Sequence, residues 1–436
     1  ATLSSKGYAV PAYSYLRKYG DFSMWDIYRA ELPLYSLITP KMSGEMMQSL
    51  VQMYKEGGWM PIFPCWNSYT AAMIGDHAGA ALADAYVKGI RNFDAAKAYE
   101  GMRLNAFSTP YLVKDYRDGK GRRAINSYMD NGYIPLEDMV EEAFHTNEQT
   151  SRTLEYAYDD YAVAQMAKAL HDSCQDATLR QKYLEDYNDL MRRSENWRNV
   201  INPATGWADG RYENGKWENN EDLVHRKSYI TEGATCHYTW YVPQNPEGLF
   251  EVIRNSKPMD KLEKQIEKTE RKMEKKGETP VRNEKVIARL DKMFDNGWYW
   301  HGNEPCHQVA YLYDAAGAPE KTQERVHHIL QTEYNDTPGG LSGNDDAGQM
   351  SAWYVFSSIG FYPVCPGTPY YYIGTPSFDK VTLNLENGRK FILSANRQHM
   401  DDYLIQSATL NGKPFGDYRL SHQQILSGGE LHFQMK

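Results

Sequence analysis

The chain has 436 residues, of which 41% are hydrophobic and 24% are charged, and its formal net charge is −9. This composition is typical of a folded globular protein and excludes a largely disordered one. A net negative charge without a basic patch argues against nucleic-acid binding, because phosphates require clustered Lys and Arg. No apolar run is long enough to predict a membrane span.

Aromatic residues are unusually frequent, with 34 Tyr and 10 Trp. Flat apolar ring faces suit the C–H faces of sugars, although packing between helices accounts for most of these residues. The 5 cysteines are widely spaced and form no C-x-x-C pair. Neither a disulfide framework nor a zinc site is therefore predicted.

Helical periodicity dominates the first 360 or so residues. One helix is predicted from Ser43 to the Gly57–Gly58 pair, which can adopt the left-handed conformation at a helix end, and a second follows at Asp76. Their apolar faces are broad, which excludes a coiled coil and favours nested helix pairs in an (α/α)6 barrel. Further helices are predicted at 95–106, 136–144, 153–171, 177–198, 307–316, 319–334 and 347–359.

Two segments depart from this pattern. Residues 257–282 are densely charged with a thin apolar stripe, which predicts a solvated helical excursion. After Pro376, alternating apolar residues and the Asn-Gly pairs at 387–388 and 411–412 predict β-hairpins. Because isolated hairpins are marginally stable, we expect residues 376–436 to complete a β-sandwich, and residues 1–375 to form the helical domain.

Polar residues concentrate in three loops, at 229–243, 301–308 and 334–354. In the last of these, Asp345 and Asp346 follow three glycines and precede a predicted helix. Gly-rich turns that carry polar residues beside aromatic ones are typical of a binding pocket. An Asp pair before a helix is also a common N-cap, so both interpretations stay open for this pair.

Several distinctive motifs extend from about Phe22 to Phe378. They are FSMWDIYRAELPLYSLI, MIGDHAGAALADAY, SRTLEYAYDDYAVAQMAKAL, WHGNEPCHQVAYLYDAAGAPEKTQ and GLSGNDDAGQMSAWYVFSSIGFYPVCPGTPYYYIGTPSF. Together these motifs resemble glycoside hydrolase family 92. The resemblance implies an (α/α)6 catalytic domain that hydrolyses terminal α-mannosides with inversion and uses a calcium ion. It also implies a secreted, periplasmic or cell-surface protein of a bacterium that degrades N-glycans.

By this resemblance, Glu232 is the expected general acid and Asp346 the expected general base, with Asp345 assisting the base. Inverting hydrolysis requires an acid and a base about 6.5–9.5 Å apart, with room for water. Aromatic neighbours of the acid, Tyr238 and Trp240 among them, would provide the apolar surroundings in which a carboxylic acid keeps its proton. A surface helix cap is the alternative role for Glu232.

The resemblance also implies the residues that hold calcium and sugar. Calcium prefers carboxylate and amide oxygens, and its expected ligands are Asn303, Glu304 and Asp346. Asp26 or Asp76 could instead be a buried helix cap paired with an arginine. The residues expected to bind the substrate are Trp25, Asp26, Arg29, Asp76, His77 and, beside the leaving sugar, His301.

The chain departs from the family in two places. Where the family usually reads E-G-N-A-W-Q-Y, residues 232–238 read E-G-A-T-C-H-Y, so we leave α-1,2 and α-1,3 linkages both open. Family members ordinarily begin with an N-terminal β-sandwich domain, which we expect to be a partner missing from this chain. The alternatives are another (α/α)6-barrel glycosidase and a non-catalytic glycan-binding protein.

Overall fold

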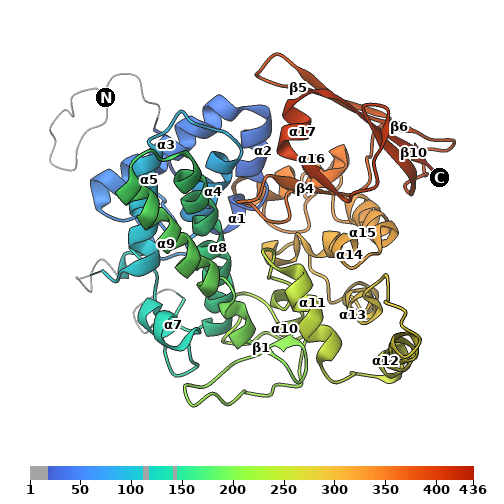
Figure 1. The fold of residues 1–436 in the computed structure, drawn as a ribbon, viewed down its shortest axis with the longest axis horizontal. Helices are drawn as coiled ribbons and strands as arrows, with labels where there is room; N and C mark the ends of the chain where they lie inside the picture. Colours follow the sequence, from blue (N-terminus) through green and yellow to red (C-terminus); the bar gives the residue numbers. More distant parts are fainter. Residues whose placement is uncertain (1–17, 111–116, 141–144) are drawn as a thin grey trace.

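Helices occupy most of the chain up to Ile359, and the C-terminal segment after it contains strands and one short helix (Figure 1). This computed structural model describes residues 18–110, 117–140 and 145–436. The prediction of a mainly helical protein with a C-terminal β segment is confirmed. Among the described residues, no helix has the length and apolar character that crossing a bilayer requires.

The N-terminal helices surround one long central helix. That helix, α8, contains no Gly or Pro, is buried on nearly every side, and packs against α4, α5 and α9. Pro40 at the first turn and left-handed Gly58 after the last one set the limits of α3. The bounds are α1 (Met24–Ile27), α2 (Glu31–Ile38), α3 (Pro40–Gly57), α4 (His77–Val87), α5 (Ala95–Phe107), α7 (Ile125–Asn131), α8 (Gln149–Ser173) and α9 (Ala177–Arg193).

Short helical turns, rather than long helices, carry several of the loops of interest. Between α9 and the sheet lie η1 (Asn196–Asn199), β1 (Ile201–Asn202), β2 (Trp207–Ala208), α10 (Thr235–Tyr238), α11 (Pro246–Asn255), α12 (Lys261–Glu274) and α13 (Glu284–Asp295). These are followed by η2 (Glu304–Cys306), η3 (Val309–Tyr311), α14 (Leu312–Ala315), α15 (Pro319–Thr332), η4 (Asp346–Gly348) and α16 (Gln349–Ile359).

Three helix predictions need correction. The helix predicted at 307–316 is instead the two short turns η3 and α14. The carbonyl of His307 accepts from Trp353 of α16, and the amide of Tyr311 bonds to Gln308, three residues back, so a 3-10 turn forms there. The helix predicted at 177–198 breaks after Arg193 and continues as η1. Residues 136–140 form a turn and extended chain rather than a helix, and 141–144 lie outside the described residues.

The C-terminal strands form two antiparallel or mixed sheets. The larger has the order β5-β6-β10-β7-β8 and the smaller β3-β4-β9, and β10 is parallel to β6. The predicted turns lie between β5 and β6 and between β7 and β8, with Gly388 and Asn411 at positive φ. The bounds are β3 (Phe361–Tyr362), β4 (Tyr370–Ile373), β5 (Lys380–Asn384), β6 (Lys390–Asn396), β7 (Ile405–Leu410), β8 (Lys413–Pro414), β9 (Arg419–Ser421), α17 (His422–Leu426) and β10 (Gly429–Met435).

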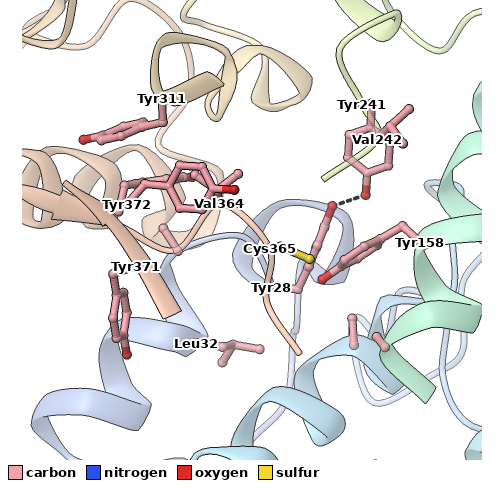
Figure 2. Packing of buried hydrophobic residues seen from close by; sticks show 14 of the residues in the cluster. Tyr28, Leu32, Tyr158, Tyr241, Val242, Tyr311, Val364, Cys365, Tyr371 and Tyr372 are labelled. Atoms are coloured by element: carbon pink, nitrogen blue, oxygen red, sulfur yellow. Dashed lines mark hydrogen bonds between the residues drawn. The ribbon is translucent and has the colours of Figure 1, made fainter. Parts of the chain in front are cut away.

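Tyrosines from distant segments pack together in the core. Tyr28, which follows α1, lies beside Tyr158 of α8, and its hydroxyl is hydrogen-bonded to that of Tyr241 (Figure 2). Tyr158 also donates to the carbonyl of Pro366, 2.8 Å away. These contacts fix α1 against α8 and against the loop that follows α10.

The charged helix α12 is anchored to α13 by one buried carboxylate. The Glu263 side chain is fully buried and accepts hydrogen bonds from Arg289, at 3.2 and 3.3 Å, and from Lys292, at 3.0 Å. The other residues of α12 are exposed or half-buried. This single carboxylate compensates the charge of a buried arginine.

We expect Glu263→Ala to lower the free energy of unfolding by about 3 kcal/mol, because Arg289 would remain buried without its partner. Urea denaturation measures this loss. Glu274→Ala, on an exposed position of the same helix, should change stability by less than about 0.5 kcal/mol. Equal losses for the two variants would contradict the anchoring role of Glu263.

Candidate active site

Three carboxylates from separate turns converge on one point. They belong to Asp26 on α1, Glu304 on η2 and Asp346 on η4, and one oxygen of each lies within 4.8 Å of the others. Asp26 and Glu304 are buried, and Asp346 is half-buried. We call these three residues the acidic group.

The acidic group holds more negative charge than its surroundings compensate. Burial and the charge of Asp346 raise the pKa of Asp26 to about 7. Burial, together with Asp26 and Asp346, raises the pKa of Glu304 to about 10. The Oε1 atom of Glu304 is buried and has no hydrogen-bond partner. Hard divalent cations such as Ca²⁺ prefer clustered carboxylate oxygens as ligands. The three carboxylates, one of which has an oxygen without a hydrogen-bond partner, therefore fit such an ion.

Asp346 and its neighbour Asp345 point in different directions. The Oδ1 atom of Asp345 accepts hydrogen bonds from the backbone N and the hydroxyl of Ser351, at 3.0 and 2.9 Å, and so caps α16. Asp346 and Ala347 both have positive φ, 47° and 57°, which is uncommon for residues with a Cβ atom. This strained turn brings the Asp346 carboxylate to the acidic group, and such strain is often retained at functional sites.

Glu232 lies beside the acidic group. Its Oε2 atom accepts a hydrogen bond from the amide of Asn303, 3.1 Å away, and its charge contributes to the raised pKa of Asp26. Glu232 is half-buried and also has a positive φ, of 53°. This fourth carboxylate is therefore outside the acidic group but within its electrostatic reach.

The aromatic neighbours of Glu232 in sequence are committed to other contacts. The hydroxyl of Tyr238 donates to Glu155, 2.9 Å away, and Trp240 packs edge-on against Trp207. Trp300, in contrast, is 45% exposed, and its ring centroid lies 6.3 Å from that of His237 in the Glu232 loop. An exposed aromatic ring is therefore available next to this loop.

Glu155 is a residue that the sequence did not single out. It is fully buried on α8 and accepts hydrogen bonds from Trp25 Nε1, at 2.8 Å, and from the hydroxyl of Tyr238. It thereby ties α1, which carries Asp26, to the loop that carries Glu232. Its signal in the sequence is the spacing of four residues to Asp159, which places two acids on one face of the predicted helix.

Asp76 and His77 belong to a buried charge network. Asp76 accepts hydrogen bonds from Asn105 and from Arg122, both at 2.9 Å, so the alternative of a buried Asp paired with an arginine applies to it. His77 stacks on Tyr28 and lies 2.8 Å from Asp159. His77 also lies 3.4 Å from Glu155, which accepts a hydrogen bond from Trp25, the neighbour of Asp26.

The other predicted sugar contacts are also buried. Arg29 donates from Nε to the carbonyl of Trp25 at 2.9 Å, and the Trp25 side chain is buried. His301 lies 2.7 Å from the hydroxyls of both Tyr299 and Tyr334, so both of its ring nitrogens are occupied. Because Tyr334 donates to the carbonyl of Met350, it accepts from His301 Nε2, and burial keeps the pKa of His301 well below its usual value.

Stability should depend on pH through His77. Burial lowers its pKa, but Asp159 and Glu155 outweigh this and raise the pKa to about 9. The charged imidazole therefore stabilises the fold fully below its unfolded pKa, near 6.5, and this contribution is lost as the pH rises to 9. We expect His77→Gln to cost on the order of 2 kcal/mol at pH 6 and little at pH 9.5. Urea denaturation at pH 6 and at pH 9.5 measures this difference. Equal losses of stability for His77→Gln at the two pH values would contradict it.

Acids grouped where a cation could bind, with a further half-buried carboxylate beside them in a mainly helical fold, are compatible with a glycoside hydrolase that uses a metal ion. The chain belongs to glycosyl hydrolase family 92, since the model of that family's catalytic domain matches residues 5–436.

Solved relatives share both sequence and fold with this chain. A family 92 α-mannosidase of Bacteroides thetaiotaomicron is 33% identical with a TM-score of 0.79, and covers 96% of this chain and 50% of its own. A family 92 inverting mannosidase of the same species is 32% identical with a TM-score of 0.81, and covers 100% of this chain and 56% of its own.

A curated relative comes from a fungus. An uncharacterised secreted glycosidase of Arthroderma benhamiae is 29% identical over 438 residues, which cover 94% of this chain and 50% of the relative. The chain therefore spans about half the length of the relatives that it matches.

Proposed function

We propose that this chain is the catalytic domain, an (α/α)6 barrel, of an exo-α-mannosidase that removes terminal α-linked mannose with inversion of configuration. The observation that carries the proposal is the position of Glu232, which lies beside the acidic group and accepts a hydrogen bond from Asn303, the neighbour of Glu304. Family membership supports it, as does the relative described as an inverting mannosidase.

Glu232 acts as the general acid in this proposal. It donates its proton to the glycosidic oxygen as the bond from the anomeric carbon to that oxygen breaks. The bond from Asn303 occupies Oε2, which leaves Oε1 to carry the proton. The leaving sugar departs as a neutral alcohol.

Asp346 acts as the general base and takes a proton from the water that attacks the anomeric carbon. Each turnover removes one proton from Glu232 and adds one to Asp346. Exchange with solvent then returns a proton to Glu232 and removes one from Asp346. Asp345 is less suited to the role of base, since its carboxylate caps α16, and it assists by holding the turn that carries Asp346.

Calcium would be held by Asp26, Glu304 and Asp346, with Asn303 beside them. When bound, it would supply positive charge that orients and polarises hydroxyl groups of the sugar. Asp26 thus joins the proposed ligands, although the sequence pattern placed it among the sugar contacts. Trp25 and Arg29 help to hold Asp26 in place within the acidic group. Trp25 donates a hydrogen bond to Glu155, and Arg29 donates one to the carbonyl of Trp25.

The substrate is proposed to be an α-mannoside of an N-glycan, with α-1,2 and α-1,3 linkages both open. Trp300 and His237 offer an aromatic surface for the leaving sugar. We also propose that the protein is exported to the periplasm or surface of a bacterium and works with an N-terminal β-sandwich domain; the secreted fungal relative supports the export.

Mannose release tests the proposal. The chain, alone and joined to the β-sandwich domain of a relative, is incubated with 4-nitrophenyl α-mannoside and with α-1,2- and α-1,3-mannobiose, in calcium and in EDTA. We expect release in calcium and a loss of about 100-fold or more in EDTA. Binding without release in either format would favour a glycan-binding protein, and release of another sugar would favour a different glycosidase.

Glu304→Gln should weaken calcium binding by about 100-fold, because it removes one negative ligand from the acidic group. Isothermal titration with Ca²⁺ measures this change. Glu324→Gln, on an exposed position of α15, should leave the affinity unchanged. Unaltered affinity in Glu304→Gln would place the cation elsewhere.

A further inference from the structure

Gln349 is a fully buried side chain at the start of α16, three residues after Asp346. Its Oε1 atom accepts hydrogen bonds from the backbone amides of Ala30 and Glu31, at 2.9 and 3.3 Å. These amides open α2, and the alanine at that helix end has no side-chain oxygen that could accept from them. Gln349 therefore joins α16 to the segment that follows Asp26.

The amide nitrogen of Gln349 reaches a third segment. It donates to Nδ1 of His307, 3.0 Å away, and Nε2 of His307 donates to the carbonyl of His301, also at 3.0 Å. Because a carbonyl only accepts, these two bonds fix the tautomer of the imidazole ring. Burial lowers the pKa of His307 to about 3, so the ring is neutral. His307 directly follows η2, the turn that begins with Glu304.

The bonds of Gln349 connect the three turns that carry the acidic group. Gln349 itself and the partners at both ends of its amide each lie about one helical turn after one of the three carboxylates. Carboxylates within 4.8 Å of one another repel, so the turns that carry them must be held in place by other contacts. The bonds of Gln349 to these partners use no carboxylate oxygen, so they leave the acids free to bind a cation.

We propose that Gln349, through His307, is a positioning residue that holds the three carboxylates of the acidic group at cation-binding distance before any ion binds. An amide is suited to this role, since its oxygen accepts from two backbone amides while its nitrogen donates to a neutral imidazole. The inference rests on the proposed function only for the identity of the ion and of the reaction. The arrangement of the carboxylates in the metal-free protein tests it separately.

Gln349→Met tests this role, because methionine fills a similar volume but cannot form these bonds. In crystals grown with EDTA, the carboxylates of the variant should lie outside the 4.8 Å range that they occupy in the parent. Isothermal titration should show an affinity for Ca²⁺ that is lower by about 10-fold or more. Mannose release should require correspondingly more calcium and recover at saturation, since the general acid and the general base are both retained.

Gln323→Met is the matched control. Gln323 is also a buried glutamine, and its Oε1 atom accepts from the backbone amide of Ile405, 2.8 Å away, but it joins α15 to β7. Its loss should leave the carboxylates and the calcium affinity as in the parent. Unmoved carboxylates in Gln349→Met, or equal losses of calcium affinity in the two variants, would overturn the inference. A parent without calcium affinity would instead contradict the proposed function, and the metal-free structures would still decide the role of Gln349.

Two substitutions at His307 test the same connection, and they apply even if Gln349→Met does not fold. His307→Asn places an amide oxygen near the position of Nδ1, where it can accept from Gln349, whereas His307→Leu offers no acceptor. We expect a calcium affinity close to that of the parent in His307→Asn and one lower by about 10-fold in His307→Leu. Equal affinities in these two variants would overturn the role of this bond.

Discussion

Replacing Glu232 by Gln is expected to lower kcat about 10³-fold for mannobiose and for natural glycans, because the departing sugar alcohol would receive no proton. Glutamine keeps the size of the side chain and can still accept the bond from Asn303, so the fold should be unaffected. Steady-state kinetics with purified variant and parent, matched for Ca²⁺ content, measure the loss.

The leaving group makes this test specific. A 2,4-dinitrophenyl α-mannoside has a leaving group that needs no proton, so Glu232→Gln should retain most of its activity on that substrate. Glu221→Gln, at an exposed position of the same loop region, should behave as the parent on both substrates. Equal losses on the activated and natural substrates would show that Glu232 is not the acid.

Asp346→Asn should lower kcat by about 10²–10⁴-fold on all substrates, activated ones included. The reason is that attack by water, unlike departure of the sugar, cannot be relieved by a better leaving group. Kinetics on the same pair of substrates measures the effect, and calcium titration separates loss of the base from loss of a metal ligand. A variant that binds calcium fully and is rescued by the activated substrate would contradict the role of base.

Asp345→Asn is the matched control at the adjacent residue. The oxygen of an Asn side chain can still accept the bonds from Ser351, so stability should change by less than about 0.5 kcal/mol, and kcat should fall far less than in Asp346→Asn. Thermal unfolding and kinetics on one preparation measure both effects. A greater loss of kcat in Asp345→Asn than in Asp346→Asn would mean that Asp345, and not Asp346, is the general base.

Local signals were sufficient for many of the helices and turns. The Gly57–Gly58 pair ended a helix as predicted, and the Asn-Gly pairs at 387–388 and 411–412 formed the hairpin turns. The prediction of one helix at 307–316 was wrong because the carbonyl of His307 is bonded to Trp353 of α16, and the amide of Tyr311 bonds three residues back to Gln308 instead. Such contacts cannot be read from a local pattern.

The candidate site was predictable only in part. The resemblance pointed to Glu232 and Asp346, yet only the backbone shows that Asp345 turns to α16 and that Asp346 turns to the acidic group. The place of Asp26 in the acidic group follows from the tertiary fold. Nothing in its local sequence distinguishes a metal ligand from a sugar contact. Asp76 and His301 also carry plausible chemistry in sequence but are committed to buried partners.

The anomer released first is the measurement that tests the central claim most directly. Hydrolysis of 4-nitrophenyl α-mannoside in calcium is followed by proton NMR within the first minutes, before mutarotation mixes the anomers. We predict that β-mannose appears first, since water attacks opposite the bond that Glu232 helps to break. Initial appearance of α-mannose would require a covalent intermediate and would contradict the roles assigned to Glu232 and Asp346.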